Sequence, residues 1–207
     1  MRLLVSTRSA HKMAEIRQIL GGVPGLTVLD LDEANIPLDP AEDDLEVYET
    51  FEDNALAKAE HFFGLSGIPT VADDSGIVVD ALDGAPGVRS KRFAPEAGLD
   101  GQERDDANNR YLVQRLMGVE PEARTARYVC VAALVGEGRE SVLLRGEAPG
   151  VVIDEPRGRG GFGYDPYILD AELGITFAEM SREQKNERSH RGSAFRALAR
   201  VLMERAG

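Results

Sequence analysis

The sequence predicts an α/β protein built on a mixed β-sheet that is flanked by helices. Strand-like and helix-like segments alternate in the first half of the chain, and two long strand-like segments follow one another later. This order is typical of a mixed sheet with helices packed against it. The 207 residues suffice for one sizeable core, and no repeat, linker or composition shift divides them, so we expect a single domain, residues 1–207.

The first part of the chain contains two strand-like segments around one helical segment. Residues 3–6 predict a short buried strand, and residues 26–31 predict a second one. Between them, apolar residues recur at helical spacing from about Ala10 until Gly21 and Gly22 end the pattern. A strand, a loop and a helix start form a layout that binds phosphate well, because the first N–H groups of a helix point outward.

The middle of the chain surrounds an acidic pair with regular structure. Residues 39–52 are acidic and lack hydrophobic periodicity, which predicts a solvated loop. Thr50 is expected to cap a helix whose apolar side chains fall within residues 55–63. Two strands are expected at residues 69–72 and 77–82.

The second half predicts a helix, a long hairpin, a loop and a final helix. Residues 100–117 show a helical pattern, and residues 124–135 and 140–153 predict a pair of long strands. A glycine-rich loop covers residues 157–163. Apolar side chains return at helical spacing over residues 194–202 and predict the last helix.

Composition limits the classes of partner. The formal net charge is −12, so the mean field repels DNA and RNA, although a local basic pocket or a metal ion can still attract a small anion. The single cysteine, Cys130, lies in an apolar run and is typical of a buried hydrophobic position. The N-terminus does not resemble a signal peptide and no apolar run reaches membrane-spanning length, so we expect a cytoplasmic protein without a membrane partner.

The sharpest chemical feature is the pair Asp73 and Asp74 in the segment Ala72–Gly76. Neighbouring strand side chains point to opposite faces, so the two carboxylates are expected to do different jobs. One carboxylate suits a hard cation such as Mg²⁺, and the other suits a water molecule or a supporting group. Asp, Ser and Gly are also typical of a polar turn between two strands, and the residues alone leave both interpretations open.

Three further segments carry candidate binding groups. The segment Thr7–Lys12 offers hydroxyls, a lysine and helix N–H groups to phosphates, although taken by itself it is better explained as an ordinary helix cap. In the glycine-rich loop, Phe162 is suited to stack on a base and Asp165 to accept a hydrogen bond from it; a flexible hairpin loop is the alternative. Cationic side chains also gather at a junction of two helices, where a solvated helix face is the common outcome: Lys185, His190 and Arg191.

Taken in order, these segments resemble the inosine triphosphate pyrophosphatase family, also described as XTP/dITP diphosphatases or house-cleaning purine triphosphate pyrophosphatases. Each landmark is weak alone, but together they span nearly the whole chain in the family's order. The matching landmarks are Thr7, Lys12 and Glu15, the run Thr50–Ala55 with Lys58, the run Ala72–Gly76, the run Gly84–Gly87 with Ser90 and Arg92, the run Gly160–Pro166, and Lys185 with Ser189–Gly192.

The resemblance implies an elongated mixed sheet with two lobes around a central cleft, and a homodimer. It implies Mg²⁺-dependent hydrolysis of inosine, deoxyinosine and xanthosine triphosphates to the monophosphate and pyrophosphate, which clears aberrant purines from the nucleotide pool. Carried over by motif, the catalytic residues are Asp74 and Asp73, and the metal ligands are Asp74 and Glu46. The substrate contacts are Thr7, Arg8, Ser9, Lys12, Lys58 and Ser75 for the triphosphate, and Phe162, Gly163, Tyr164, Asp165, Lys185, His190 and Arg191 for the nucleoside.

The chain departs from the family pattern at two places. Arg8 and Ser9 stand where glycine and asparagine are usual, so we expect either that Arg8 contacts phosphate in compensation or that it faces solvent while Ser9 caps the helix. The acidic loop around Glu46 differs from the usual run, and Glu46 is our choice for the second metal carboxylate. Two other functions remain open, namely a pyrophosphatase of similar fold for modified pyrimidine triphosphates and a nucleotide-binding module without turnover.

Overall fold

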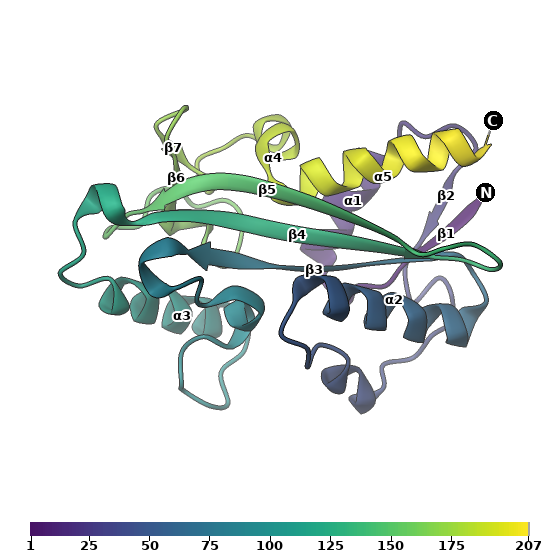
Figure 1. Cartoon of the computed structure of the whole chain (residues 1–207), viewed down its shortest axis with the longest axis horizontal. Coiled ribbons are helices and arrows are strands. Elements are labelled where there is room, and N and C mark those ends of the chain that lie inside the picture. The colour runs from purple at the N-terminus through teal and green to yellow at the C-terminus, as the bar shows by residue number, and fades with distance from the viewer. Residues whose placement is uncertain (207) are drawn as a thin grey trace. The chain divides into compact units, whose positions relative to one another are not determined.

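The computed structural model describes residues 1–206, which form a seven-stranded sheet with helices packed against it (Figure 1). The strand order is β2-β1-β3-β4-β5-β6-β7. The strands are β1 (Arg2–Val5), β2 (Thr27–Leu29), β3 (Thr70–Val79), β4 (Thr125–Val135), β5 (Val142–Val152), β6 (Ile168–Asp170) and β7 (Ile175–Thr176). The α-helices are α1 (Ala10–Leu20), α2 (Phe51–Ser66), α3 (Gly101–Arg115), α4 (Arg182–Arg188) and α5 (His190–Ala206).

The pairing of the strands confirms an α/β fold with a mixed sheet. Strand β1 pairs in parallel with both β2 and β3, whereas β6 pairs antiparallel with both β5 and β7. Among the described residues, no helix is both long enough and apolar enough to cross a bilayer.

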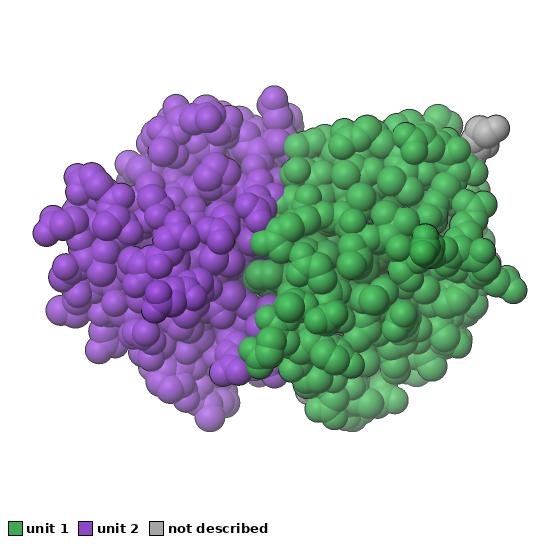
Figure 2. All heavy atoms as spheres, in the orientation of Figure 1, with its two compact units in different colours: residues 1–74, 130–146, 190–207 green, residues 75–129, 147–189 purple. Residues whose placement is uncertain are grey.

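The chain forms two compact units, which Figure 2 shows in different colours. Unit 1 consists of residues 1–74, 130–146 and 190–207, and unit 2 consists of residues 75–129 and 147–189. Strands β3, β4 and β5 each contribute residues to both units. The boundaries between the units therefore fall within these strands.

The core of unit 1 covers both faces of β1. Leu3 and Val5 are buried in one apolar cluster together with α1 and α5, whereas Leu4 is buried in another cluster with Phe62 of α2. Successive strand side chains point to opposite faces, so an uninterrupted apolar run is required where helices cover both sides. Unit 2 has its own cluster, in which α3 packs against the strands and the Tyr128 and Phe177 rings meet edge to face at 5.1 Å.

Most predicted elements are confirmed, and one prediction is wrong in an informative way. The helices expected after Ala10 and after Thr50 are α1 and α2, and the Thr50 side chain caps α2 by accepting from Asp53 N–H. The two strands predicted around the aspartate pair are instead one continuous strand, β3, so the polar-turn interpretation fails. The acidic loop contains a short 3₁₀ helix, Pro40–Asp44, that begins with an Asp39 capping box.

A glycine in β5 tests the contact between this strand and α5. A Cβ atom at Gly146 would lie 2.6 Å from the backbone nitrogen of Ala194, and backbone cannot move away cheaply. We expect Gly146→Ala to lower the free energy of unfolding by about 1–3 kcal/mol through overpacking. Urea unfolding followed by circular dichroism measures this change. Gly22→Ala is the matched control, because nothing lies within 4 Å of the added carbon, and equal stability of the two variants would contradict the contact.

Candidate active site

Strand β3 presents Asp73 and Asp74 to opposite faces of the sheet. Asp73 follows Val71 by two residues and shares its face, where α1 and α5 complete the core. Asp74 points to the other face, where Asn54 of α2 donates to its Oδ2 atom at 2.9 Å. Both carboxylates are buried, with 2% and 6% of their residue surface exposed. The strand therefore places two adjacent charges in two separate environments.

Asp73 is neutralised by cations from both helices on its face. Lys12 Nζ of α1 donates to Asp73 Oδ2 at 3.0 Å, and Arg191 of α5 donates from Nε and Nη2 at 3.4 Å each. Arg191 also donates to Glu15 at 2.7 Å. Burial raises the pKa of Asp73, but Lys12, Arg191 and Lys58 outweigh it and hold the pKa well below its usual range. Asp73 is consequently a permanent anion that anchors two cations.

Asp74 has the opposite electrostatic environment. Burial and the negative charge of Glu46 raise the pKa of Asp74 to about 6, against the smaller lowering effects of Asn54, Lys12 and Lys58. Asn54 is itself fixed, because its side chain bonds to both backbone groups of Tyr48. Enzymes use neighbouring carboxylates with such different pKa values to give each a different role in acid–base chemistry.

Lys58 of α2 links the acidic loop to β3. Its Nζ donates to Glu46 at 2.6 Å and to the backbone carbonyl of Asp73 at 3.2 Å. Burial lowers the pKa of Lys58, but the charges of Glu46 and Asp73 raise it more, so the ammonium group persists. The pKa of Glu46 is lowered, because Lys58 outweighs the effect of burial. The structure thus brings Glu46, Lys58 and both aspartates together in unit 1.

The loop between β1 and α1 borders a cavity of about 300 Å³ that Thr7, Arg8 and Ser9 help to line. Ser9 caps α1 by accepting from Lys12 N–H, and Thr7 Oγ1 accepts from Ser9 N–H. Arg8 forms a two-bond ion pair with Glu42, with Nη2 at 2.7 Å, and donates to the carbonyls of residues 36 and 37. Arg8 therefore ties the loop to the acidic segment while part of its side chain stays exposed, and a contact between Arg8 and phosphate stays a prediction.

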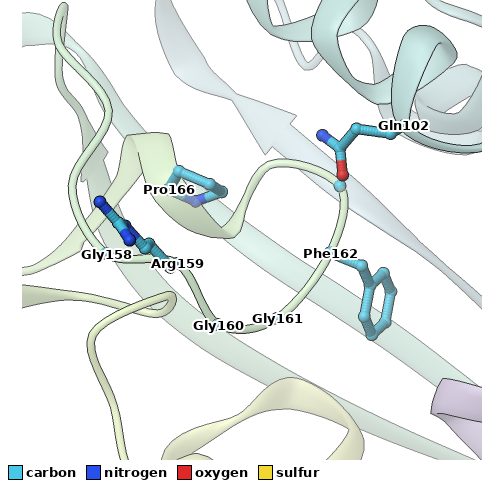
Figure 3. Close-up of a pocket in the computed structure, with 8 residues that line it drawn as sticks. Gln102, Gly158, Arg159, Gly160, Gly161, Phe162 and Pro166 are labelled. Atoms are coloured by element: carbon cyan, nitrogen blue, oxygen red, sulfur yellow. The ribbon is translucent and has the colours of Figure 1, made fainter.

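The glycine-rich loop of unit 2 borders a cavity of about 250 Å³, shown in Figure 3. Asp165 organises this loop from within, because its Oδ2 accepts from Phe162 N–H at 3.0 Å and from Lys185 Nζ at 2.7 Å. Its Oδ1 accepts from the Tyr128 hydroxyl at 3.1 Å. Lys185 Nζ also lies 5.0 Å from the centre of the Phe162 ring, a cation–π distance. Asp165 thus holds the backbone of Phe162 and the ammonium group of Lys185, and its predicted bond to a base stays a prediction.

The remaining nucleoside-pocket candidates fall into different surroundings. Tyr164 is buried in unit 2, and its hydroxyl donates to the Ser90 carbonyl at 2.8 Å. His190 and Arg191 begin α5 in unit 1 and are buried there, with Arg191 on Asp73 and Glu15. Ser75 follows Asp74 on β3 and is half-buried. The structure consequently groups Arg191 with Asp73 and Glu15 of unit 1.

Several residues that contact the candidate site residues were not predicted from the sequence. Asn54 and Glu15 stand within the family landmarks, yet nothing in the local sequence shows that they contact Asp74 and Arg191. On α3, Asp105 and Asn109 contact the glycine-rich loop from 58 and 54 residues away. The available signal was a polar pair four residues apart, which lies on one face of a helix.

Comparison with known proteins places the chain among close relatives. A model of the Ham1 family matches residues 3–201. The dITP/XTP pyrophosphatase of Geobacter sulfurreducens is 45% identical over 95% of this chain and 94% of its own length, and that of Nocardia farcinica is 43% identical over 97% and 94%. A solved HAM1 protein from Coxiella burnetii matches with a TM-score of 0.85 and 31% identity, covering 99% of both chains. The resemblance inferred from the motifs is thereby confirmed.

The buried charge network predicts unequal effects of two similar substitutions. Asp73→Asn removes the carboxylate that pairs with Lys12, whereas Arg191 keeps Glu15, so we expect a loss of about 3–5 kcal/mol in the free energy of unfolding. Asp74→Asn removes a charge that burial already disfavours, so its cost is expected to be below about 1 kcal/mol. Urea unfolding at neutral pH compares the two variants. Equal destabilisation would show that Asp73 does not anchor the network.

Proposed function

Because the chain belongs to the Ham1 family, we propose that it hydrolyses the triphosphates of inosine, deoxyinosine and xanthosine to the monophosphate and pyrophosphate. The name dITP/XTP pyrophosphatase carried by its relatives supports this substrate class. The observation that carries the chemistry is the buried pair Asp73 and Asp74, with Lys12 and Lys58 beside it in unit 1. This set joins a proton acceptor to cations that suit a polyphosphate.

Unit 1 supplies the groups for the triphosphate. Lys12 and Lys58 are cationic, and the start of α1 adds outward-pointing N–H groups next to Thr7 and Ser9. Arg8 is not part of this set in our proposal, because Glu42 and two backbone carbonyls hold its guanidinium group. Its proposed contribution is to hold the acidic segment that leads to Glu46.

The carboxylates of unit 1 fit a magnesium ion. Mg²⁺ prefers oxygen ligands and is usually bound by one or two carboxylates together with substrate phosphates. Asp74 and Glu46 supply two carboxylates close enough to influence each other's charge. Glu46 is paired with Lys58, whereas Asp73 is bound by both Lys12 and Arg191. Within residues 1–206, no three His, Cys, Asp or Glu side chains form a metal-binding group, which suits an ion whose coordination the substrate completes. When bound, the ion supplies positive charge that neutralises the phosphates.

The remaining catalytic roles are assigned to side chains of unit 1. Asp74 is placed to orient the attacking water and to accept its proton as the α–β phosphoanhydride bond breaks and pyrophosphate leaves. Lys12 and Lys58 stabilise charge that develops on the phosphate oxygens. Asp73 keeps Lys12 in position. Phosphoryl transfer of this kind requires no covalent nucleophile.

Unit 2 supplies the groups for the base. Phe162 offers an aromatic face, and Lys185 beside it offers hydrogen-bond donors. Hypoxanthine and xanthine carry a carbonyl at the six-position, whereas adenine carries an amine there. A donor committed to that carbonyl is left unpaired by adenine, which disfavours binding. The roles of Gly163, Tyr164, His190 and Arg191 toward the base, and of Ser75 toward phosphate, stay predictions.

The assembly and the location of the chain also stay predictions. The family resemblance implies a homodimer, and we propose that both units act as one pyrophosphatase domain over residues 1–207. A cytoplasmic location and the absence of a nucleic-acid partner rest on composition and charge.

A panel of triphosphates tests the proposed function. We expect pyrophosphate release from dITP and XTP to exceed that from dATP and dCTP by at least about a hundredfold in kcat/KM. Asp74→Asn is the matched control and is expected to lower kcat by at least about a hundredfold, since it removes the proton acceptor but keeps the side-chain volume. Preference for a pyrimidine triphosphate, or binding of dITP without turnover in the wild type, would overturn the proposal.

Removal of metal provides a separate test. Asp74 and Glu46 offer only oxygen ligands, so we expect EDTA to abolish pyrophosphate release and excess Mg²⁺ to restore it. Isothermal titration of Mg²⁺ with and without a non-hydrolysable triphosphate shows whether the substrate completes the site. The variant Glu46→Gln should require more Mg²⁺ for half-maximal activity. Full activity in chelator would show that the two carboxylates do not serve a metal.

A further inference from the structure

Two side chains of α3 hold the glycine-rich loop of unit 2 from outside. The N–H group of Gly163 donates to Asp105 Oδ2 at 2.8 Å, and the carbonyl of Gly163 accepts from Asn109 Nδ2 at 2.9 Å. Asp105 and Asn109 are four residues apart on α3, so they lie on the same helix face. One face of this helix thereby binds both polar backbone atoms of a single loop residue.

The neighbouring residue, Phe162, is held in the same way by the loop itself. Its N–H group donates to Asp165 Oδ2 at 3.0 Å, and its carbonyl accepts from Asp165 N–H at 3.3 Å. All four polar backbone atoms of Phe162 and Gly163 therefore have a protein partner. Asp165 provides one half of this restraint, and α3 provides the other half.

The conformation of the loop explains why such restraint is needed. Gly161 and Gly163 have φ angles of +74° and +61°, in the region that glycine enters freely. A Cβ atom at Gly163 would meet nothing within 4 Å, so packing does not fix this residue. A glycine-rich segment loses much conformational entropy when it is ordered, and hydrogen bonds to its backbone have to compensate for that loss.

The surroundings of Asn109 indicate that its position serves the loop. Only 4% of this residue is exposed, and its Oδ1 atom is buried without a hydrogen-bond partner among residues 1–206. Burying an unpaired oxygen disfavours the folded state, and an apolar side chain at this place would avoid that loss. The bond from Asn109 Nδ2 to Gly163 is the compensating interaction.

We propose that Asp105 and Asn109 are positioning residues for base recognition, which fix the Gly163 peptide and so the direction in which Phe162 presents its ring. This inference rests on the proposed function, because it takes Phe162 as the aromatic contact of the purine. Both residues act through the loop backbone and do not touch the substrate. Asp105 and Asn109 thus determine selectivity between bases while leaving the phosphate-binding groups of unit 1 unchanged.

A single-tryptophan reporter tests the restraint without any substrate. The chain contains no tryptophan, so Phe162→Trp gives a fluorophore at the loop alone. In this background, Asp105→Ala is expected to raise the acrylamide quenching constant about twofold, because the loop loses one of its backbone partners. Asp105→Asn retains an acceptor oxygen and should restore most of the protection. Glu103→Gln is the matched control, because it removes an acidic charge from the same helix at an exposed position.

Kinetics on the chain with its native Phe162 test the link to the base. Asp105→Ala and Asn109→Ala are each expected to raise KM for dITP about tenfold, with kcat within about twofold of the wild type, and to reduce the preference for dITP over dATP. Inhibition by inorganic tripolyphosphate, which has no base, should stay unchanged. Circular dichroism confirms that the variants are folded, and Asn109→Ala carries the test if Asp105→Ala does not fold.

The outcomes separate this inference from the function on which it rests. If the wild type hydrolyses dITP but the α3 variants alter neither quenching nor base preference, the positioning role is overturned and the function stands. If tripolyphosphate inhibition weakens as much as dITP binding, the effect is general destabilisation and the positioning role is again overturned. If the wild type does not hydrolyse dITP, the base-recognition role falls with the function, while the quenching result still shows whether α3 holds the loop.

Discussion

The alternation of side chains along β3 is the constraint on which the site depends. Because neighbouring residues of a strand face opposite sides, Asp73 and Asp74 cannot share one pocket. Each buried carboxylate needs its own compensation, and helices from both sides of the sheet supply it. The side of α1 and α5 brings two cations to Asp73, whereas the side of α2 brings an amide and another carboxylate to Asp74. A difference in acidity between adjacent residues is the direct result of strand geometry.

Positive side chains gather in unit 1 although the protein as a whole is negatively charged. The chain carries a formal charge of −12, yet Lys12, Lys58 and Arg191 gather within reach of two aspartates. Buried charges are screened less by salt than exposed ones, so these cations influence an anion at short range more than the distant acidic surface does. An acidic protein can therefore bind a polyphosphate while its surface repels nucleic acid.

Local sequence signals predicted the elements well, because they depend on neighbouring residues. The Thr50 cap and the helical spacing after Ala10 are examples, and both are found as expected. The continuous course of β3 through a polar segment was missed, since the ion pairs that stabilise buried aspartates come from residues 61 and 118 positions away. Motif order identified the family, and the site residues that it gave are candidates. It could not show that Arg191 contacts Asp73, because a motif gives residue types and not their partners.

Unit 1 consists of three separate segments of the chain, so its parts are synthesised at different times. Its first segment ends at Asp74, but α5, which carries Arg191, is synthesised only after all of unit 2. Until then, Asp73 lacks one of its two helix-borne cations, and the apolar faces of β1 and α1 lack the helix that covers them. Chains released early would expose this surface and be recognised by chaperones or proteases. The charge network around Asp73 is therefore completed only after unit 2 has been synthesised.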